Sequence, residues 1–273
     1  MSSSAKSAPQ LAMVSLLPSQ RRDRIVDFLR RHGAVTLQQL AQAMDASVST
    51  LRRDLDALEA DGLLDRTHGG ALLRQQHYST FEPNPAAAAE LSPREKRAIG
   101  YAAAADLQPG QSVIFDSGST VMEAARAALE RRIELVAVTN DLAIAQLLGS
   151  SALVRVHVLG GVLRRDSNTL MGDEVLRGAG HIRADVLLMG AHAVTDGVLS
   201  ETDPEVAAVK RALMQAATSK RLLVDASKFR PRAFMTICPL AEFSEVITDT
   251  GLPAHEAETL AQAGLKLTLV SVA

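Results

Sequence analysis

The stretch SVSTLRRDLDALEADGLLDRTHGG, residues Ser47–Gly70, decides the fold of the N-terminal part of the chain. Apolar residues recur in it at spacings of three and four, which predicts an amphipathic helix whose buried face holds Val48, Leu51, Leu55 and Leu58. Ser47 stands directly before this pattern and is a suitable N-cap. The opposite face then carries Ser49, Thr50, Arg52 and Arg53. A helix that only packs needs no paired arginines, so this polar face predicts a binding function.

A second amphipathic pattern, VTLQQLAQAM, precedes the first. Thr36 is a suitable N-cap for it, and its inward residues are Leu37, Leu40, Ala41 and Met44. Asp45 and Ala46 form a tight turn between the two patterns. Two short helices joined in this way predict a helix-turn-helix, whose second helix enters the major groove of DNA. Arginine at that position can bind guanine through two hydrogen bonds or contact a phosphate.

The residues after Gly62 predict a β-hairpin beside these helices. LLDRT and ALLRQ are short extended runs, and Gly69-Gly70 between them supplies the turn. Such a hairpin is typical of a wing that approaches the DNA backbone, with Arg66 and His68 as donors. The sequence therefore predicts a winged helix-turn-helix. The residues that we expect to contact DNA are Thr36, Gln38, Ser47, Ser49, Thr50, Arg52, Arg53, Arg66, His68, Gly69 and Gly70.

The charge of this module leaves an alternative open. Residues 20–74 contain nine Lys and Arg and eight Asp and Glu, so their net charge is only 9 − 8 = +1. Charged pairs on a helix are usually no more than a solvated face. Since the whole chain has a net charge of −2, nucleic-acid binding has to come from a local patch.

The flanks of the module set the expected domain organisation. A helical pattern runs from Ser19 through RRDRIVDFLRRHG and ends at Gly33. Residues 1–18 hold a short, broken apolar patch and no signal peptide, so we expect a disordered tail. Residues 75–93 contain three prolines and no clean period, which predicts a linker. The expected division is thus a tail (1–18), a winged helix-turn-helix (19–74), a linker (75–93) and a second domain (94–273).

The composition excludes several classes of protein. The 273 residues are 47% hydrophobic and 22% charged, which is typical of a globular chain with its own core. The single cysteine, Cys238, excludes an intramolecular disulfide and a cysteine-rich zinc site. No run approaches the roughly 20 apolar residues of a membrane span. We therefore expect a cytoplasmic protein without a membrane partner, a metal or a cofactor.

From Arg94 onward, short β-branched runs alternate with alanine-rich helical patterns. The runs are SVIF, IELVAV, VRVHVL, DVLLMG, RLLVD, FMTIC, EVIT and LKLTLV. The helical patterns between most of them are VMEAARAALE, DLAIAQLL and PEVAAVKRALMQAA. This alternation predicts βαβ units, and hence an α/β domain with a mainly parallel sheet.

The segment SVIFDSGSTVMEAARAAL places a glycine-containing loop between a strand and a helix. Unpaired N–H groups and the positive end of the helix dipole make such a loop an anion site. The hydroxyls of Ser117, Ser119 and Thr120 add donors that suit a phosphate. Asp116 would repel a phosphate, so we expect it to meet sugar hydroxyls or to organise the loop. A plain helix cap is the alternative, because Ser/Thr-Gly turns are common at helix starts.

Small and polar residues also follow several other predicted strands. In an open α/β sheet, ligands bind outside the carboxyl ends of the strands. Lys228 could pair there with a phosphate, although a surface lysine is an equally simple interpretation. The residues that we expect around an effector are Asp116, Ser117, Gly118, Ser119, Thr120, Thr139, Asn140, Gly160, Gly161, Gly190, Asp225 and Lys228. His157 and His192 stand alone and are interpreted as core or surface histidines.

These motifs together resemble the DeoR-type bacterial transcriptional regulators. That family's DNA-binding signature is matched here by Ser47, Thr50, Leu51, Arg52, Arg53, Asp54, Leu55, Arg66, His68, Gly69, Gly70 and Ala71. The order of REKRAIG, DSGST, TND, LGG, MG, VKRALM, DASKF and VITD is similar to the family's effector-sensing domain. Ser119 stands where the family usually has Thr, which keeps the hydroxyl. The stretch from Ala191 to Pro204 follows the family less clearly and could carry effector specificity.

The resemblance implies a fold and a function. The implied fold is a winged helix-turn-helix joined to an α/β domain similar to ribose-5-phosphate isomerases and glucosamine-phosphate deaminases. The implied function is repression of carbohydrate-catabolism genes by a nucleoid-associated homodimer or homotetramer, which a phosphorylated sugar releases from operator DNA. The alternative is a sugar-phosphate isomerase or deaminase with an appended DNA-binding module, for which Asp116, Asp225 and Lys228 are the candidate bases. Activation in place of repression also stays open.

Overall fold

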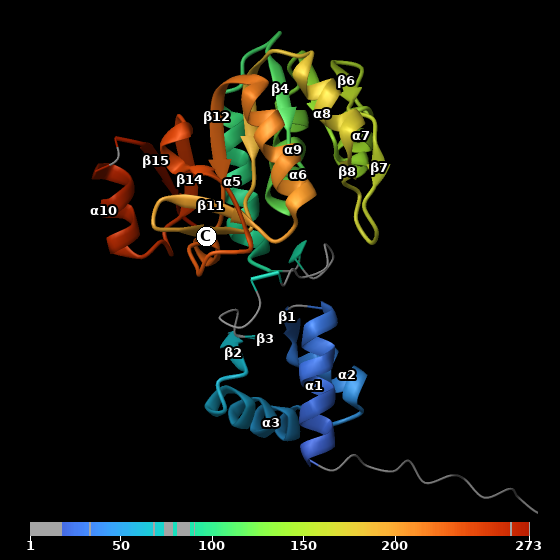
Figure 1. The fold of residues 1–273 in the computed structure, drawn as a ribbon, viewed down its shortest axis with the longest axis vertical. Coiled ribbons are helices and arrows are strands. Elements are labelled where there is room, and N and C mark those ends of the chain that lie inside the picture. The colour runs from blue at the N-terminus through green and yellow to red at the C-terminus, as the bar shows by residue number, and fades with distance from the viewer. Residues whose placement is uncertain are drawn as a thin grey trace, which may run out of the picture.

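The computed structural model describes residues 18–32, 34–67, 69–73, 79–80, 88–89, 91–262 and 264–272. Figure 1 shows two units, which we call the head (elements α1 to β3) and the large domain (elements α5 to β15). Nearly all of the predicted disordered tail and most of the predicted linker lie outside the described residues. So do Gly33, the predicted helix end, and His68, a predicted DNA contact.

The head consists of helices packed against a small sheet. The helices are α1 (Pro18–His32), α2 (Leu37–Met44) and α3 (Val48–Ala60), and the strands are β1 (Ala34–Thr36), β2 (Leu64–Thr67) and β3 (Gly70–Leu73). The strands are antiparallel in the order β1-β3-β2. The predicted winged helix-turn-helix is confirmed. The sequence does not reveal β1, because three residues are too few to show a period of two.

Both predicted N-caps of the helix-turn-helix are present. Thr36 Oγ1 accepts a hydrogen bond from Gln39 N at 3.2 Å, and the Gln39 side chain accepts one from Thr36 N at 2.8 Å, which completes a capping box. Ser47 Oγ accepts a hydrogen bond from Thr50 N at 3.2 Å. Asp45 adopts a left-handed conformation with φ of 48° and ends α2. These local interactions set the short turn between α2 and α3.

The predicted buried face of α3 needs one correction. Its three leucines are buried, but Val48 is 37% exposed. Val48 is the first residue of the helix and lies outside the cluster of buried apolar side chains in the head. Asp54 is buried instead, at 5% exposure, and pairs with Arg21 through Nε–Oδ2 at 2.5 Å and Nη2–Oδ1 at 3.2 Å. This charged pair ties α1 to α3.

Seven parallel strands form the central sheet in the described part of the large domain. Their order is β15 (Lys266–Val270), β14 (Glu245–Asp249), β12 (Ala217–Leu223), β9 (Ala184–Met189), β4 (Ser112–Phe115), β5 (Leu135–Thr139) and β6 (Val154–Val158). Every neighbouring pair in this sheet is parallel. The predicted α/β class with a mainly parallel sheet is therefore confirmed.

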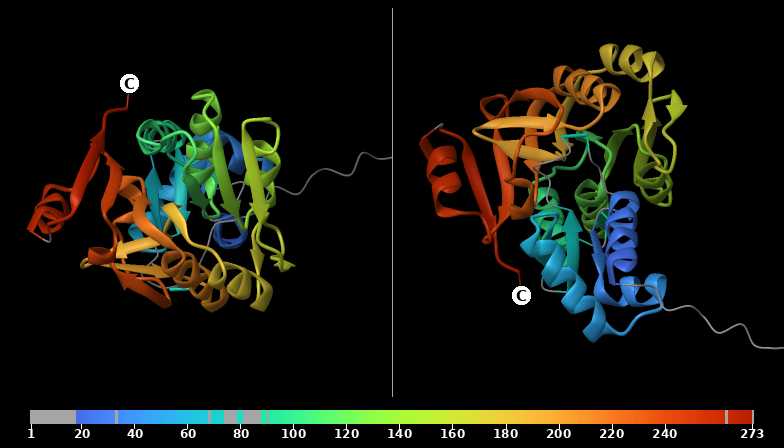
Figure 2. Two further views of the ribbon diagram at one scale, coloured as in Figure 1. Left: turned by 90° about the horizontal axis from the view of Figure 1, so that it is seen from above. Right: turned by 60° about the horizontal axis from the view of Figure 1, so that its bottom comes forward.

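Helices cover both faces of this sheet (Figures 1 and 2). One face packs against α5 (Pro93–Ala105), α6 (Ser119–Glu130) and α7 (Leu142–Leu148), and the other against α8 (Asp173–Gly180), α9 (Pro204–Gln215) and α10 (Ala254–Gln262). Along β4, Val113 and Phe115 belong to the first cluster and Ile114 to the second, as the period of a strand requires. Burial on both faces explains why the strands are continuous apolar runs.

One predicted strand has partners outside the central sheet. FMTIC corresponds to β13 (Met235–Pro239), which forms a separate antiparallel sheet with β10 (Ala193–Thr195) and β11 (Val198–Glu201). Strands β7 (Val162–Leu163) and β8 (Leu170–Met171) form a second short antiparallel pair. A short 3₁₀ helix, η2 (Ala226–Lys228), follows β12. A β-branched run indicates that a strand exists, but not which strand it pairs with.

The direction in which strands are added to the sheet reverses at β4. From β4 the chain adds β5 and β6 on one side, and then β9, β12, β14 and β15 on the other. Connections that leave the carboxyl ends of two such neighbouring strands diverge, which opens a crevice between them. Asp116 N donates to Leu188 O at 3.0 Å and so holds the ends of β4 and β9 together. The fold therefore places its crevice at the loop DSGST.

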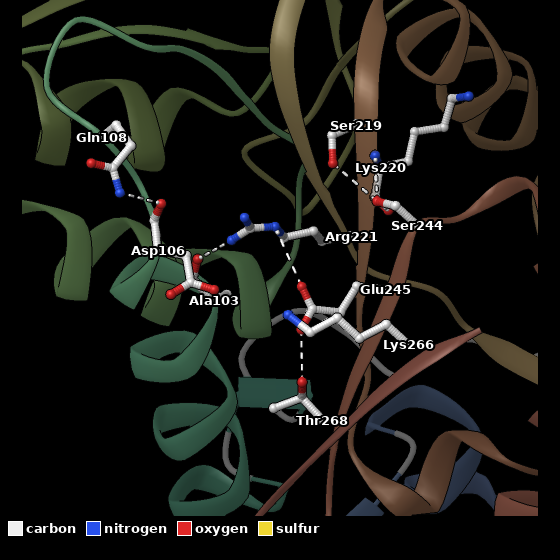
Figure 3. A network of polar contacts seen from close by, with 10 residues as sticks. All are labelled: Ala103, Asp106, Gln108, Ser219, Lys220, Arg221, Ser244, Glu245, Lys266 and Thr268. Atoms are coloured by element: carbon white, nitrogen blue, oxygen red, sulfur yellow. Dashed lines mark hydrogen bonds and ion pairs between the residues drawn. The ribbon is translucent and has the colours of Figure 1, made fainter. Parts of the chain in front are cut away.

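A polar network around Glu245 joins three strands and a helix (Figure 3). The buried Glu245 carboxylate lies 3.5 Å from Arg221 Nε and 2.9 Å from Lys266 Nζ, and it accepts a hydrogen bond from Thr268 Oγ1 at 2.7 Å. Arg221 Nη1 also donates to Ala103 O of α5 at 3.0 Å. The network thus links β12, β14, β15 and α5 through paired charges.

At Gly70 the backbone of the head leaves no room for a side chain. A Cβ there would lie 1.9 Å from Val35 O of the neighbouring strand. We expect Gly70→Ala to lower the free energy of unfolding of the head by about 1–3 kcal/mol, as measured by urea denaturation. Gly69→Ala is the matched control, since a Cβ at Gly69 would meet no described atom within 4 Å. Equal stability of the two variants would contradict this close approach of β1 and β3.

Candidate functional site

Four of the predicted DNA contacts lie on α3, in its first two turns. Ser49, Arg52 and Arg53 are exposed, and Thr50 is half-buried. Leu51, Leu55 and Leu58 anchor the opposite face of the helix in the head core. The arginine pair therefore points away from the core, in the first two turns of the second helix of the motif. This is the arrangement in which a helix-turn-helix reads DNA.

The other predicted contacts in the head have different surroundings. Thr36 and Gln38 are exposed at the start of α2, although the Thr36 hydroxyl already caps that helix. Gly69 is exposed at the tip of the hairpin, and its carbonyl accepts a hydrogen bond from Leu37 N at 2.8 Å. Gly70 is buried against β1. Of the two glycines predicted to contact DNA, Gly69 is therefore accessible to a ligand and Gly70 is not.

Arg66 ties the hairpin to α3. Its guanidinium forms an ion pair with Asp56 and lies 3.5 Å from the carbonyl oxygen of Arg52, while its backbone N donates to Glu59 Oε1 at 3.2 Å. A DNA phosphate would have to compete with Asp56 for this side chain. The structure thus gives Arg66 a role in holding the wing against the helix.

A cavity of about 360 Å³ lies in the crevice where the strand order reverses. This volume is of the order expected for a small-metabolite site. Its walls include the loops after β4 and β9, the starts of α5 and α6, the turn between β7 and β8, α9 and η2. Half of the predicted effector residues line it, namely Ser117, Gly118, Ser119, Thr120, Gly190 and Lys228.

The start of α6 forms one wall of this cavity. Its N-cap, Gly118, has φ of 126°, a conformation that residues with a side chain rarely adopt. Among the described residues no side chain caps this helix, so its first N–H groups are not taken up by a serine hydroxyl. Ser119 and Thr120 begin a helix of 12 residues and line the cavity. Amide N–H groups, hydroxyls and the positive end of the helix dipole thus meet at one place, as an anion requires.

A buried ammonium lies next to this wall. Lys210 Nζ is 2.5 Å from Asp116 Oδ2, 2.9 Å from Gly190 O and 3.6 Å from Glu201 Oε1. Asp116 is 1% exposed and Lys210 is 4% exposed. Glu201 Oε1 also accepts a hydrogen bond from the backbone N of His192 at 3.1 Å. The cluster neutralises the Asp116 charge and fixes the loop after β4, which is the organising role that we considered for Asp116.

Cationic side chains outnumber carboxylates around the cavity. The five cations are Lys96, Arg126, Arg164, Lys210 and Lys228, and the three carboxylates are Glu123, Asp141 and Glu201. Burial raises the pKa of Asp141, whose carboxylate caps α7 through Ala143 N and Ile144 N. A surplus of positive charge in a partly enclosed site favours an anionic ligand.

The surroundings lower the pKa of two basic side chains that line the cavity, His192 and Lys228. Burial, together with the positive charges of Arg230, Lys228 and Lys210, lowers the pKa of His192 to about 2. His192 lines the cavity and is held in its neutral form. Burial and the nearby Arg230 lower the pKa of Lys228 to about 8, against the attraction of Asp225. An anion in the cavity would stabilise the charged form of Lys228.

Six predicted effector residues do not line the cavity: Asp116, Thr139, Asn140, Gly160, Gly161 and Asp225. Thr139 and Asn140 are buried at the end of β5, where Asn140 Nδ2 donates to Leu170 O at 3.1 Å. Asp225 caps η2 through Ser227 N at 3.1 Å. A Cβ at Gly161 would lie 2.4 Å from Met171 O, so this glycine allows a close backbone approach.

Sequence reasoning missed four of the lining cations: Lys96, Arg126, Arg164 and Lys210. Lys96 and Lys210 stand in REKRAIG and VKRALM, two stretches that resemble the family, and this was the available signal. In a helical pattern they look like solvent-exposed charges, yet both are buried.

The described residues contain no group of three His, Cys, Asp or Glu that could hold a metal ion. In the same part of the chain, no helix combines the length and the apolar character needed to cross a membrane.

Comparison with known families assigns both units. The model of the DeoR-like helix-turn-helix domain matches residues 21–77, and that of the DeoR C terminal sensor domain matches residues 92–250. The chain belongs to the DeoR family. α3 lies within the matched helix-turn-helix range, and most of the residues that line the cavity lie within the matched sensor-domain range.

Curated relatives of this DeoR-family protein match over most of its length. The putative aga operon transcriptional repressor of Escherichia coli O157:H7 is 32% identical over 92% of this chain and 94% of its own. The repressor CsqR of Escherichia coli K12 is 30% identical over 89% and 92% of the two chains. The lactose phosphotransferase system repressor of Lactococcus lactis is 29% identical over 89% and 95%. These relatives are named as repressors, so the isomerase or deaminase alternative is not favoured.

Solved structures give weaker matches. Ribose 5 phosphate isomerase A from Neisseria gonorrhoeae is 16% identical and covers 50% of this chain and 53% of its own, with a TM-score of 0.38. The eIF2B delta subunit from Chaetomium thermophilum is 12% identical and covers 84% and 70% of the two chains, with a TM-score of 0.43. The fold assignment therefore rests on the strand order of the chain itself.

The buried Lys210 cluster leads to a stability prediction for this DeoR-family protein. We expect Lys210→Met to lower the free energy of unfolding of the large domain by about 3–5 kcal/mol, because it leaves Asp116 buried without its counter-charge. Adding Asp116→Asn to Lys210→Met should restore part of that loss. Urea denaturation of the wild type, both single variants and the double variant measures the coupling. Strictly additive effects of the two substitutions would contradict a direct Lys210–Asp116 interaction.

Proposed function

We propose that this protein represses a carbohydrate-related operon and leaves its operator when a phosphorylated sugar binds the cavity. The observation that carries the proposal is the presence, in one chain, of an exposed arginine-bearing helix and a cation-lined cavity at a helix start. The first suits duplex DNA, and the second suits a small anion with hydroxyl groups.

The DNA half of the proposal is supported by the geometry of α3. Arg52 and Arg53 are exposed while the leucines of the same helix fix its orientation on the head. Arginine forms the commonest specific contact in the major groove, a bidentate pair with guanine. The relatives named as repressors support operator DNA as the target and repression as the outcome.

The effector half is supported by the lining of the cavity. A phosphate fits the start of α6, where Ser117, Ser119 and Thr120 supply hydroxyl donors. Glu201 and Asp141 on other walls could accept hydrogen bonds from sugar hydroxyls. One relative is named for a lactose phosphotransferase system, which supports a carbohydrate link.

We further propose that residues 19–74 bind DNA and residues 94–273 bind the effector, with residues 75–93 joining them. One head contacts too few base pairs to be specific within a genome, so the protein would act as a homodimer or homotetramer. Operator binding would place it on the nucleoid, in the cytoplasm.

Arg53→Ala tests the DNA-reading face. We expect it to weaken binding to a promoter-derived duplex by about 1–3 kcal/mol, or roughly 5- to 150-fold, since it removes one base or phosphate contact. Fluorescence anisotropy at several salt concentrations measures both the affinity and the salt slope.

Arg183→Ala is the control for Arg53→Ala, because it removes the same charge from an exposed position of the large domain. The control should bind the duplex as the wild type does. Unchanged affinity of Arg53→Ala would show that another face of the head meets the DNA.

Ser117→Asp tests the anion site. A thermal-shift screen of the wild type against ribose 5-phosphate, glucose 6-phosphate, fructose 1-phosphate and galactosamine 6-phosphate should find a stabilising ligand. At 100 times its Kd, such a ligand raises the free energy of unfolding by about 2.7 kcal/mol. Ser117→Asp should lose this stabilisation and keep operator affinity, because its carboxylate repels the phosphate.

Ser150→Asp, which adds the same charge at an exposed position outside the cavity, is the control for Ser117→Asp. Ligand-induced stabilisation of Ser117→Asp equal to that of this control would mean that the phosphate does not bind at the start of α6.

A further inference from the structure

We propose that Lys96 couples the cavity to the chain segment that leads to the head. Without effector, its buried ammonium holds two carbonyls of that segment, and an anion in the cavity draws the ammonium away and frees the segment. The inference rests on the proposed function and names the residue through which effector binding would reach the DNA-binding unit.

Lys96 holds the segment by direct contacts. It lies on the first turn of α5, is 2% exposed, and its Nζ donates to Leu91 O at 2.5 Å and to Ala88 O. Both acceptors are backbone carbonyls of residues that precede α5 in the chain. They therefore belong to the segment that connects the head to the large domain. One buried side chain thus contacts this segment at two described residues.

The same residues form part of the cavity wall. Lys96, Ala88 and Ala89 line the cavity together with Ser117–Thr120 at the start of α6. An anion bound at the start of α6 would therefore share one cavity with Lys96.

The charge of Lys96 lacks a strong partner within the described residues. No carboxylate of this part of the chain forms an ion pair with its Nζ, and the two acceptors are neutral carbonyls. Burial lowers the pKa of Lys96, and the negative charges of Asp225, Glu95 and Glu123 offset this only from beyond ion-pairing distance. A buried ammonium with neutral acceptors gains from an entering anion, because hydrogen bonds between two charged groups are about twice as strong as neutral ones.

A second contact holds the segment on the large domain. Phe234 N, at the start of β13, donates to Ser79 O at 2.9 Å. This is a single neutral hydrogen bond, and Phe234 itself is exposed. Among the described residues, loss of the Lys96 contacts would remove the two hydrogen bonds that a charged side chain gives to this segment.

Lys96→Met tests the coupling, because it keeps the length of the side chain and removes the ammonium. Operator affinity is measured by fluorescence anisotropy, without ligand and with the sugar phosphate that stabilises the wild type most in the screen. We expect the ligand to weaken operator binding of the wild type by about 5- to 150-fold, the usual range of allosteric coupling. Lys96→Met should bind the operator as weakly as the ligand-bound wild type does, and the ligand should change its affinity less than about twofold.

Arg97→Met is the matched control, since Arg97 lies on the same helix as Lys96 and carries one charge but is exposed and does not line the cavity. It should bind the operator as the wild type does and keep the response to ligand. Tight operator binding by Lys96→Met, or a full response to the ligand, would overturn the proposal. Absence of any response in the wild type would overturn the proposed function as well, so the two failures are distinguishable.

Hydrogen exchange of the wild type is a second test, which does not require Lys96→Met to fold. We expect the same sugar phosphate to increase amide exchange in residues 79–92. Inorganic phosphate serves as a probe of the anion alone, with chloride at equal ionic strength as its control. Unchanged exchange in residues 79–92 at saturating sugar phosphate would overturn the proposal.

Discussion

The buried ion pair between Lys210 and Asp116 is the interaction on which the cavity depends. Asp116 follows β4 directly before the proposed anion site, where an uncompensated carboxylate would repel the ligand. The ammonium from α9 neutralises it at 2.5 Å and also binds the carbonyl of Gly190 after β9. The two strand ends that define the crevice are thereby held by one charge. Because breaking a buried pair is costly, the start of α6 has a fixed position before any ligand arrives.

The sequence was informative wherever the structure depends on neighbouring residues. Capping chemistry at Thr36 and Ser47 and the leucine spacing of α3 are local, so the helix-turn-helix was predictable. The loop Ser117–Thr120 was predictable for the same reason. Burial is a tertiary property, and for that reason Lys96 and Lys210 looked like surface charges. Strand order is tertiary too: β6 lies two strands away from β4, so Gly160 and Gly161 follow a strand end that the cavity does not reach.

The buried polar groups of the large domain are of two kinds, those with a close partner and those without one among the described residues. Around Glu245 each charge has a close partner, and the network contains no residue of the cavity (Figure 3). Near the cavity, Asp116 Oδ1, Asn140 Oδ1 and Asp225 Oδ2 are buried atoms without a hydrogen-bond partner among the described residues. Buried acceptors without partners weaken a fold and are usually retained where a ligand or water completes them. The stable network and the incomplete region thus belong to different parts of one sheet.

The ion pair of Arg66 with Asp56 fixes the hairpin of the head against α3, and this affects how operator sequences change in evolution. Since it joins the wing to α3, and Arg21 joins α1 to the same helix, the head keeps one shape wherever it is carried. The bases read within one half-site are then a property of the head alone. In the proposed homodimer or homotetramer, the distance and angle between two half-sites would instead be set by the assembly that holds the heads. Sequence preference and operator spacing can therefore evolve independently within such proteins.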